Sequence, residues 1–164
     1  MYPSSDRNLS YETDEAIYFF SHAFDPLNNW SAHAINIWGK RFPSVEHAYH
    51  YRKFSDALPE VAQAILDAPS PRAAMQVERR HKKRRRADWE DVKQGIMEEI
   101  VRAKVAQHDD VRTCLLATDD KKIIENSPWD AFWGCGPDGA GNNAMGKIYM
   151  QIRKNLKEDK NEAN

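Results

Sequence analysis

The 164-residue chain is poor in cysteine, in long apolar runs and in net charge, and each shortage excludes a class of protein. Cys114 and Cys135 are too few for a disulfide framework or a cysteine zinc site, so we expect two reduced, independent thiols and a cytoplasmic location. Apolar runs stop at four or five residues, whereas a membrane-spanning helix needs about 20. A net charge of −1 gives the whole molecule no general affinity for nucleic acids or membranes.

The length indicates one domain, and the periodicity indicates a mostly α-helical α+β fold with a few short strands. Strands are predicted at 18–20, 34–38 and 122–125, with a turn at Gly39-Lys40. Helices are predicted at 44–56, at 59–67, from Pro71, from Asp88, at 111–117 and at 144–156; Ser44 and Ser70 are the expected N-caps. We predict a flexible arm over residues 1–16, the domain over 17–157 and a polar tail over 158–164.

A loop rich in tryptophan and glycine occupies residues 127–143. It holds two of the five tryptophans and four of the seven glycines, together with Asp130 and two asparagines. Tryptophan offers a rigid face for stacking, and glycine lets the backbone approach a ligand closely. The composition predicts a wall of a ligand site beside a carboxylate.

The helix that begins at Ser44 carries a carboxylate, an imidazole and an amine on one face. Glu46, His50 and Lys53 are spaced i, i+4 and i+7, which places them on one stripe. Beside a cavity these groups can perform acid, base or nucleophilic chemistry; otherwise they form a solvated face. A metal site using Glu46, His47 and His50 is a weaker alternative, because the order E-H-x-x-H is not that of zinc proteases. We predict no metal and no cofactor.

Several ordered blocks of the chain resemble the NADAR/YbiA-like family. The blocks are residues 43–49 with Lys53-Phe54, residues 88–93 with Met97 and Ala103-Lys104, and residues 115–118, 130–134, 141–143 and 146–147. Residues 27–30 are similar to a further element near the front of the family pattern. Together the resemblance covers roughly residues 18 to 156, which makes it far more specific than one motif.

The resemblance implies an N-glycosidase that cleaves the C–N bond of a ribosylated base or nucleotide. Family branches act on phosphoribosylated pyrimidine intermediates of riboflavin biosynthesis or remove ADP-ribose from guanine. Cleavage builds positive charge at the anomeric carbon and needs a proton for the departing base. Glu46 and Asp130 are the carboxylates expected to perform these two tasks, in either assignment. The resemblance further implies that Lys53 attacks the open-chain ribose aldehyde as a Schiff-base amine. The alternative for Lys53 is a salt bridge to a neighbouring carboxylate.

Seven further residues are predicted to bind the substrate: Asn29, His50, Trp89, Trp133, Gly134, Gly141 and Asn143. Each has a structural alternative, which is core packing for the tryptophans and turn formation for Gly and Asn. We expect the loop pair Asp130 and Trp133 to face the helix pair Glu46 and Lys53 across one cleft.

Residues 79–86 form a basic run in which seven of eight residues are Lys or Arg. The run fits a substrate phosphate, a nucleic-acid backbone or a solvated surface. Here the chain departs from the small-Gly-Arg pattern of the family, with Val77-Glu78-Arg79 in that region.

The expected partner is a small ribosylated base or nucleotide, with ADP-ribosylated nucleic acid as a further substrate and no membrane. The alternative function is a binding module that holds ADP-ribose or NAD-like ligands without turnover.

Overall fold

The computed structural model describes residues 9–20 and 22–162, and these fall into two compact units. The first unit holds the described residues up to Asn28 and those from Asp110 onward, and the second holds Asn29–Asp109. Six α-helices and five short strands occur in the described residues, so the prediction of a mostly helical α+β fold is confirmed.

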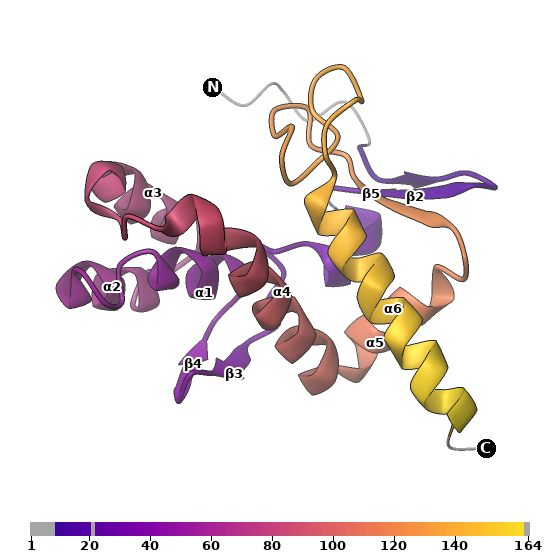
Figure 1. Ribbon diagram of the computed structural model, residues 1–164, viewed down its shortest axis with the longest axis horizontal. Coiled ribbons are helices and arrows are strands. Elements are labelled where there is room, and N and C mark those ends of the chain that lie inside the picture. Colours follow the sequence, from indigo (N-terminus) through magenta and orange to yellow (C-terminus); the bar gives the residue numbers. More distant parts are fainter. Residues whose placement is uncertain (1–8, 21, 163–164) are drawn as a thin grey trace. The chain divides into compact units, whose positions relative to one another are not determined.

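The first unit is built on a three-stranded sheet in the order β1-β2-β5. Its elements are β1 (Tyr11–Glu12), β2 (Ala16–Phe19), the 3-10 helix η1 (His22–Leu27), α5 (Asp109–Ala117, from Asp110 on), β5 (Lys122–Glu125) and α6 (Ala144–Glu162). β2 runs antiparallel to β1 and parallel to β5, with Ile17 opposite Ile123. Both of these side chains are fully buried, because α6 packs against β5 (Figure 1).

Helix α6 is fixed to the first unit by apolar packing and by two buried polar side chains. Met145, Ile148 and Ile152 recur at helical spacing and are buried. The Tyr149 hydroxyl donates a hydrogen bond of 2.8 Å to the Leu27 carbonyl. One turn later, the Arg153 guanidinium donates to the side chain and carbonyl of Thr118 and to the Lys121 carbonyl. These bonds tie α6 to the end of η1 and to the segment between α5 and β5.

The second unit gathers four helices, of which the first contacts the other three (Figure 1). They are α1 (Val45–Arg52), α2 (Pro59–Leu66), α3 (Pro71–His81) and α4 (Trp89–Gln107), with the 3-10 helix η2 (Lys82–Arg84) after α3. Ser44 and Ser70 cap α1 and α3 by accepting bonds from the backbone N–H of His47 and Ala73, as predicted. Pro71 occupies the first helical position of α3.

A two-stranded hairpin, β3 (Ile35–Ile37) and β4 (Lys40–Phe42), completes the second unit. Trp38 and Gly39 connect the strands and both have positive φ, 52° and 70°. That is the backbone of a two-residue turn whose twist matches the hairpin. The turn therefore lies at Trp38-Gly39, one residue earlier than predicted.

Helices α1, α2 and α3 share a core that lies directly beside Lys53. It consists of buried apolar side chains: Phe54, Val61, Ala62, Ile65, Ala68 and Ala74. Phe54 follows Lys53 in the chain and is fully buried, so the backbone at Lys53 is held by the packing of its neighbour. A hydrogen bond of 2.9 Å from the Arg86 N–H to the Lys53 carbonyl fixes the same point.

Several predicted segment ends differ from the structure. Helix α1 ends at Arg52 and not at 56, because the N–H of Phe54 bonds to Tyr51 in a tighter turn. Helix α6 continues to Glu162, six residues beyond the predicted end. Residues 1–8 of the predicted arm lie outside the described residues; of the remainder, Tyr11–Glu12 forms β1, which was not predicted, and Ala16 begins β2. The domain bounds 17–157 stay a prediction.

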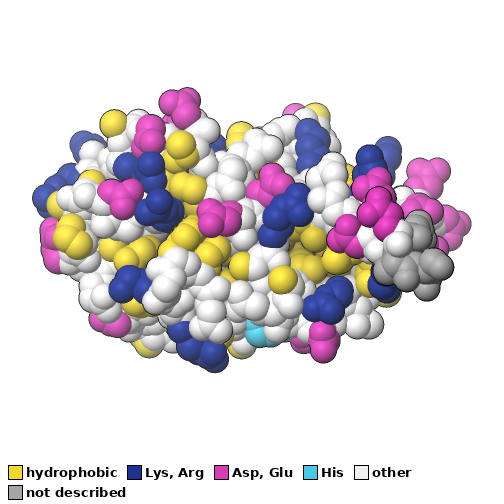
Figure 2. Space-filling view, turned by 60° about the horizontal axis from the view of Figure 1, so that its bottom comes forward, with side chains coloured by type: hydrophobic (Ala, Val, Ile, Leu, Met, Phe, Trp, Pro, Cys, Tyr) yellow, Lys and Arg dark blue, Asp and Glu magenta, His cyan; other side chains and the backbone are white. Residues whose placement is uncertain are grey.

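Basic and acidic side chains are interspersed over much of the face shown in Figure 2, in keeping with a net charge of −1. Within the described residues, none of the helices combines the length and the apolar character that crossing a membrane requires.

Candidate active site

Helix α1 brings Glu46 and His50 into direct contact. The His50 Nε2 atom lies 2.9 Å from the Glu46 Oε1 atom, and the side chains are 7% and 14% exposed. The i, i+4 spacing that predicted one stripe is therefore realised as a largely buried acid–imidazole pair. This is not the solvated face of the alternative prediction.

Glu46 is surrounded by groups that favour its ionised form. Burial by itself would raise the pKa of Glu46, but the charge and hydrogen bond of His50, the charge of Lys53 and a hydrogen bond from Trp30 outweigh it. The pKa of Glu46 lies below its ordinary value as a result. Glu46 is a carboxylate at neutral pH, suited to stabilising positive charge.

Lys53 is a buried amine in an ion pair. Its Nζ atom lies 3.0 Å from Oε1 of Glu78 on α3, and both side chains are only 7% exposed. The same Nζ atom lies 4.9 Å from the ring centre of Tyr49 and 5.3 Å from that of Trp89. The salt-bridge alternative for Lys53 is thus realised, with two aromatic faces beside it.

Burial sets the direction of the Lys53 pKa. Desolvation lowers the pKa of Lys53, the negative charges of Glu78 and Glu46 raise it, and Arg85 lowers it again. Burial prevails, so the pKa of Lys53 lies below that of an ordinary lysine. A lowered amine pKa is the property that a Schiff-base lysine requires.

Two buried polar atoms beside Glu46 have no hydrogen-bond partner among the described residues. They are Oδ1 of Asn29 and Nδ1 of His50. The Asn29 carbonyl accepts the N–H of Glu46 at 3.2 Å, so all three residues lie together on α1 and the segment before it. Asn29 Oδ1 can only accept, whereas His50 Nδ1 accepts in the neutral ring and donates in the charged ring. Buried polar atoms without partners are costly, and a ligand that forms hydrogen bonds would satisfy them.

Both ring nitrogens of His47 have partners within the fold. Its Nδ1 atom lies 2.8 Å from the Ser44 hydroxyl and its Nε2 atom 3.0 Å from the Ala68 carbonyl. Burial lowers the pKa of His47, in keeping with a neutral ring wedged between α1 and the α2–α3 connection. Across the described part of the chain, no three His, Cys, Asp or Glu side chains lie close enough together to hold a metal ion.

Trp89 is both a core residue and a neighbour of the amine. It is 2% exposed and meets the Tyr49 ring edge to face, with ring centres 4.9 Å apart. Core packing is therefore the role that the structure shows, while contact with a substrate stays a prediction.

The tryptophan–glycine loop of the first unit is ordered by Asp130. One carboxylate oxygen, Oδ1, accepts the N–H groups of Phe132 at 2.9 Å and Trp133 at 2.7 Å. This turn presents a half-buried Trp133 ring, which contacts Phe132 with ring centres 4.9 Å apart. Asp130 thus has a structural task of its own, and its catalytic role stays a prediction.

The glycines of the loop permit close contacts within the loop itself. A Cβ atom on Gly141 would lie 2.5 Å from the Gly134 carbonyl oxygen, and one on Gly134 would lie 2.7 Å from the Glu125 carbonyl oxygen. The Asn143 side chain accepts the Glu125 N–H at 2.9 Å and donates to the Ile123 carbonyl at 2.8 Å, so it extends the edge of β5. For these residues the structure shows the alternative of turn and backbone packing, and substrate contact stays a prediction.

Replacing Gly141 with Ala is expected to lower the free energy of unfolding by about 1–3 kcal/mol, because backbone atoms must move to admit the methyl group. Urea denaturation followed by circular dichroism measures the effect. The matched control is Gly95→Ala in α4, where an added Cβ meets nothing within 4 Å; that exchange is expected to stabilise by about 0.5–1 kcal/mol. Equal stability of wild type and Gly141→Ala would contradict the tight packing of the loop.

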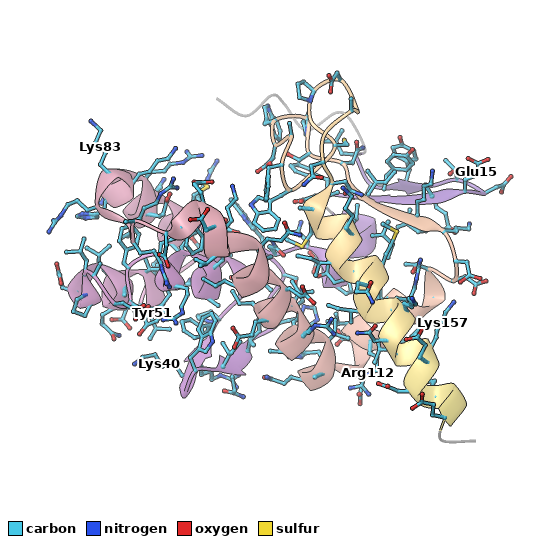
Figure 3. The ribbon with its side chains drawn as sticks, in the orientation of Figure 1. Glu15, Lys40, Tyr51, Lys83, Arg112 and Lys157 are labelled. Carbon is cyan, nitrogen blue, oxygen red and sulfur yellow. The ribbon has the colours of Figure 1, made fainter. Side chains whose placement is uncertain are left out.

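The basic run divides into paired and outward-facing cations. Arg85 pairs with Glu90, and Arg86 binds Asp88 through two hydrogen bonds. The other five cations are exposed: Arg79, Arg80, Lys82, Lys83 and Arg84. Figure 3 shows Lys83 extending away from the ribbon. The run therefore offers a cluster of five accessible positive charges.

Two residues of the site were not predicted. Trp30 donates a hydrogen bond to Glu46 although its ring is 41% exposed, and Glu78 pairs with Lys53 from 25 positions away. A single acidic residue inside a basic helix was the signal that could have pointed to Glu78. The predicted site residues divide between the two units. The second unit holds Glu46, Lys53, Asn29, His50 and Trp89, and the first holds Asp130, Trp133, Gly134, Gly141 and Asn143. The facing of the two groups across a cleft stays a prediction.

Known proteins resemble this chain over most of its length. A model of the NADAR domain matches residues 11–157. An N-glycosidase of Nostoc punctiforme is 38% identical, covering 86% of this chain and 92% of that protein, and the N-glycosidase YbiA of Escherichia coli is 36% identical, covering 87% and 89%. The solved structure of E. coli YbiA superposes with a TM-score of 0.80, covering 94% of this chain and 92% of the other at 34% identity. A riboflavin biosynthesis protein of Vibrio vulnificus is 36% identical over 88% of this chain, which spans 40% of that longer protein. The chain belongs to the NADAR domain family.

Proposed function

We propose that this protein is an N-glycosidase that cleaves the C–N bond between a ribosyl group and a base, with Glu46 and Lys53 as catalytic residues. The activity is supported by relatives named N-glycosidases that match almost the whole chain. The observation that carries the mechanism is the buried amine of Lys53, which lies on the same helix face as an ionised carboxylate.

The carboxylate of Glu46 meets the main electrostatic demand of the reaction. Positive charge develops at the anomeric carbon as the C–N bond breaks, and a fixed negative charge in a buried site stabilises it strongly. His50 and Trp30 hold that charge in place by hydrogen bonds. Asp130 is the second proposed carboxylate, and the role left for it is to donate a proton to the departing base.

Lys53 supplies the proposed nucleophile. Once the ribosyl ring has opened to an imine, in which the base nitrogen is still bound to C1, the Lys53 amine adds to C1 and expels the base as a free amine. This leaves a Schiff base on Lys53, which water later hydrolyses. The lowered pKa of Lys53 increases the fraction of free amine at neutral pH. Tyr49 and Trp89 keep the amine between two aromatic faces and limit its access to water.

The proposed substrate is a phosphoribosylated aminopyrimidine or an ADP-ribosylated guanine. Both carry amino and hydroxyl groups, which can donate to the unsatisfied acceptor Asn29 Oδ1. Trp133 is the proposed stacking partner from the loop, with Gly134, Gly141 and Asn143 shaping the turn around it. The thiols Cys114 and Cys135 fit a reducing compartment, which supports the proposed cytoplasmic location.

The five exposed cations of the basic run favour a second form of the substrate, in which the modified guanine is carried in a nucleic acid. A phosphate backbone binds such a cluster, and the affinity falls steeply as salt rises. The competing function is a module that binds ADP-ribose or a similar ligand without turnover. A pure binder needs no buried amine beside an ionised carboxylate, so the geometry of α1 favours the enzyme.

A substrate panel tests the proposal. The protein is incubated with phosphoribosylaminopyrimidines, with ADP-ribosylated guanosine and with the same guanosine in an oligonucleotide at low and high salt, and free base is measured. Release of base from at least one substrate is expected, and it should stop in Lys53→Ala. Faster release from the oligonucleotide, lost at high salt, would support the nucleic-acid form. Tight binding without release would support the binding module and contradict the enzyme.

A further inference from the structure

We propose that Glu78 is a positioning residue for Lys53: it holds the amine as an oriented ammonium ion in the resting protein and takes up a proton when the amine reacts. The inference rests on the proposed role of Lys53 and deepens it by naming the group that controls the amine. Glu78 has no place in the mechanism above, and the resemblance noted from the sequence has a glycine pattern in this region.

The contact between Glu78 and Lys53 is direct and shielded from water. Glu78 Oε1 accepts a hydrogen bond of 3.0 Å from Lys53 Nζ, and both side chains are 7% exposed. Glu78 lies on α3, whereas Lys53 caps the end of α1. The pair therefore fixes the direction of a long, flexible side chain across two packed helices.

Packing alone does not account for this pair. Two ions removed from water lose their hydration, and two apolar side chains of similar volume would fill the same space at lower cost. The next residues of α3, Arg79 and Arg80, point into solvent, so Glu78 is the acidic member of the helix that turns inward. A buried ion pair kept at such a place indicates a task for the charge.

The charges around the amine define that task. Glu46 of α1 and Glu78 of α3 attract the proton of Lys53, Arg85 after η2 repels it, and the Tyr49 and Trp89 rings cover the amine. Glu78 is the carboxylate in hydrogen-bond contact with Nζ. Of the charges near the amine it therefore acts most directly on whether Lys53 is an ammonium ion or a nucleophile.

The proton balance of the step follows from this contact. A proton moves from Lys53 Nζ to Glu78, and the freed lone pair forms a bond to C1 of the ring-opened ribosyl imine while the C=N π pair moves to the nitrogen of the base. Glu78 returns its proton to that nitrogen as the base leaves. Two of the three ammonium protons depart on the amino group of the free base, and the third remains on the iminium nitrogen of Lys53. Charge and atoms balance without a further reactant.

Reductive labelling measures the amine directly and needs no substrate. The protein is treated with formaldehyde and cyanoborohydride from about pH 6 to about pH 10, a range that brackets the free-amine transition of a lysine with a lowered pKa. Mass spectrometry then follows methylation of Lys53. Without the charge of Glu78, the midpoint for Glu78→Gln is expected to fall by about one pH unit, which raises labelling below the midpoint about tenfold. Glu78→Asp keeps the carboxylate but sets it back by one methylene. Its midpoint for Lys53 labelling is therefore expected to lie between those of Glu78→Gln and wild type.

Lys104 is the internal control. It is fully buried in the same unit, and its Nζ atom donates a hydrogen bond of 2.8 Å to Ser31 and makes no contact with Glu78. Its labelling should not respond to either variant, which excludes general opening of the unit as the cause of a shift. An unchanged Lys53 midpoint in either folded variant would overturn the inference. Because no substrate is present, failure of the proposed glycosidase would leave this result unaffected.

Discussion

Replacing Glu46 with Gln is expected to lower kcat/KM for base release by about 10²- to 10⁴-fold. The amide keeps the size of the side chain but removes the charge that stabilises the developing cation at the anomeric carbon. The fold should survive, because His50 and Trp30 can still hydrogen-bond an amide. Steady-state release of free base, with circular dichroism to monitor folding, measures the effect.

Glu60→Gln is the matched control for this prediction. Glu60 lies in the first turn of α2 and is exposed, so the same chemical change there should leave kcat/KM within about twofold, the usual range of a surface exchange. Because the pKa of Glu46 lies below its ordinary value of 4.5, the wild-type enzyme should keep the ionised form until the pH falls beneath that value. Unchanged base release by Glu46→Gln would remove Glu46 from the mechanism.

Replacing Lys53 with Met is expected to reduce activity at least about 10²-fold, the scale of a lost catalytic group, and to destabilise the fold at the same time. The exchange leaves Glu78 buried without its partner, which costs about 3–5 kcal/mol of unfolding free energy at neutral pH. Urea denaturation measures the second effect and base release the first.

The double variant Lys53→Met with Glu78→Leu separates the two effects. With both charges gone, an apolar pair occupies the space, and the stability should return to within about 1 kcal/mol of wild type or exceed it. Activity should remain lost, because no amine is present. Lys82→Met, on the exposed η2, controls for loss of a lysine as such. Recovered activity in the double variant would show that Lys53 serves only as half of an ion pair.

Most helix starts and strand β5 could be predicted from the sequence, because their signals are local. Ser44 and Ser70 are typical N-cap residues and mark the starts of α1 and α3, and β5 occupies the predicted residues 122–125. The end of α1 could not be predicted, since a tertiary constraint ends it: Phe54 is drawn into the core that α1 shares with α2 and α3.

The site was predicted in part for the same reason. Glu46, His50 and Lys53 lie on one helix, and their spacing alone places them on one face. Glu78 was not predicted to belong to the site, because its partner Lys53 lies 25 residues away and at the end of another helix. The loop glycines were predicted to approach a ligand, whereas Gly134 and Gly141 approach neighbouring backbone, a distinction that sequence composition does not contain.

Trapping with borohydride during turnover tests the central claim, that the buried amine of Lys53 carries the glycosidic cleavage. We expect a reduced adduct with the mass of the ribosyl moiety on Lys53 and on no other lysine, including Lys104, which is buried still more deeply. The adduct should be absent from Lys53→Arg. Sustained release of free base with Lys53 unmodified would contradict the account and would indicate direct attack by water.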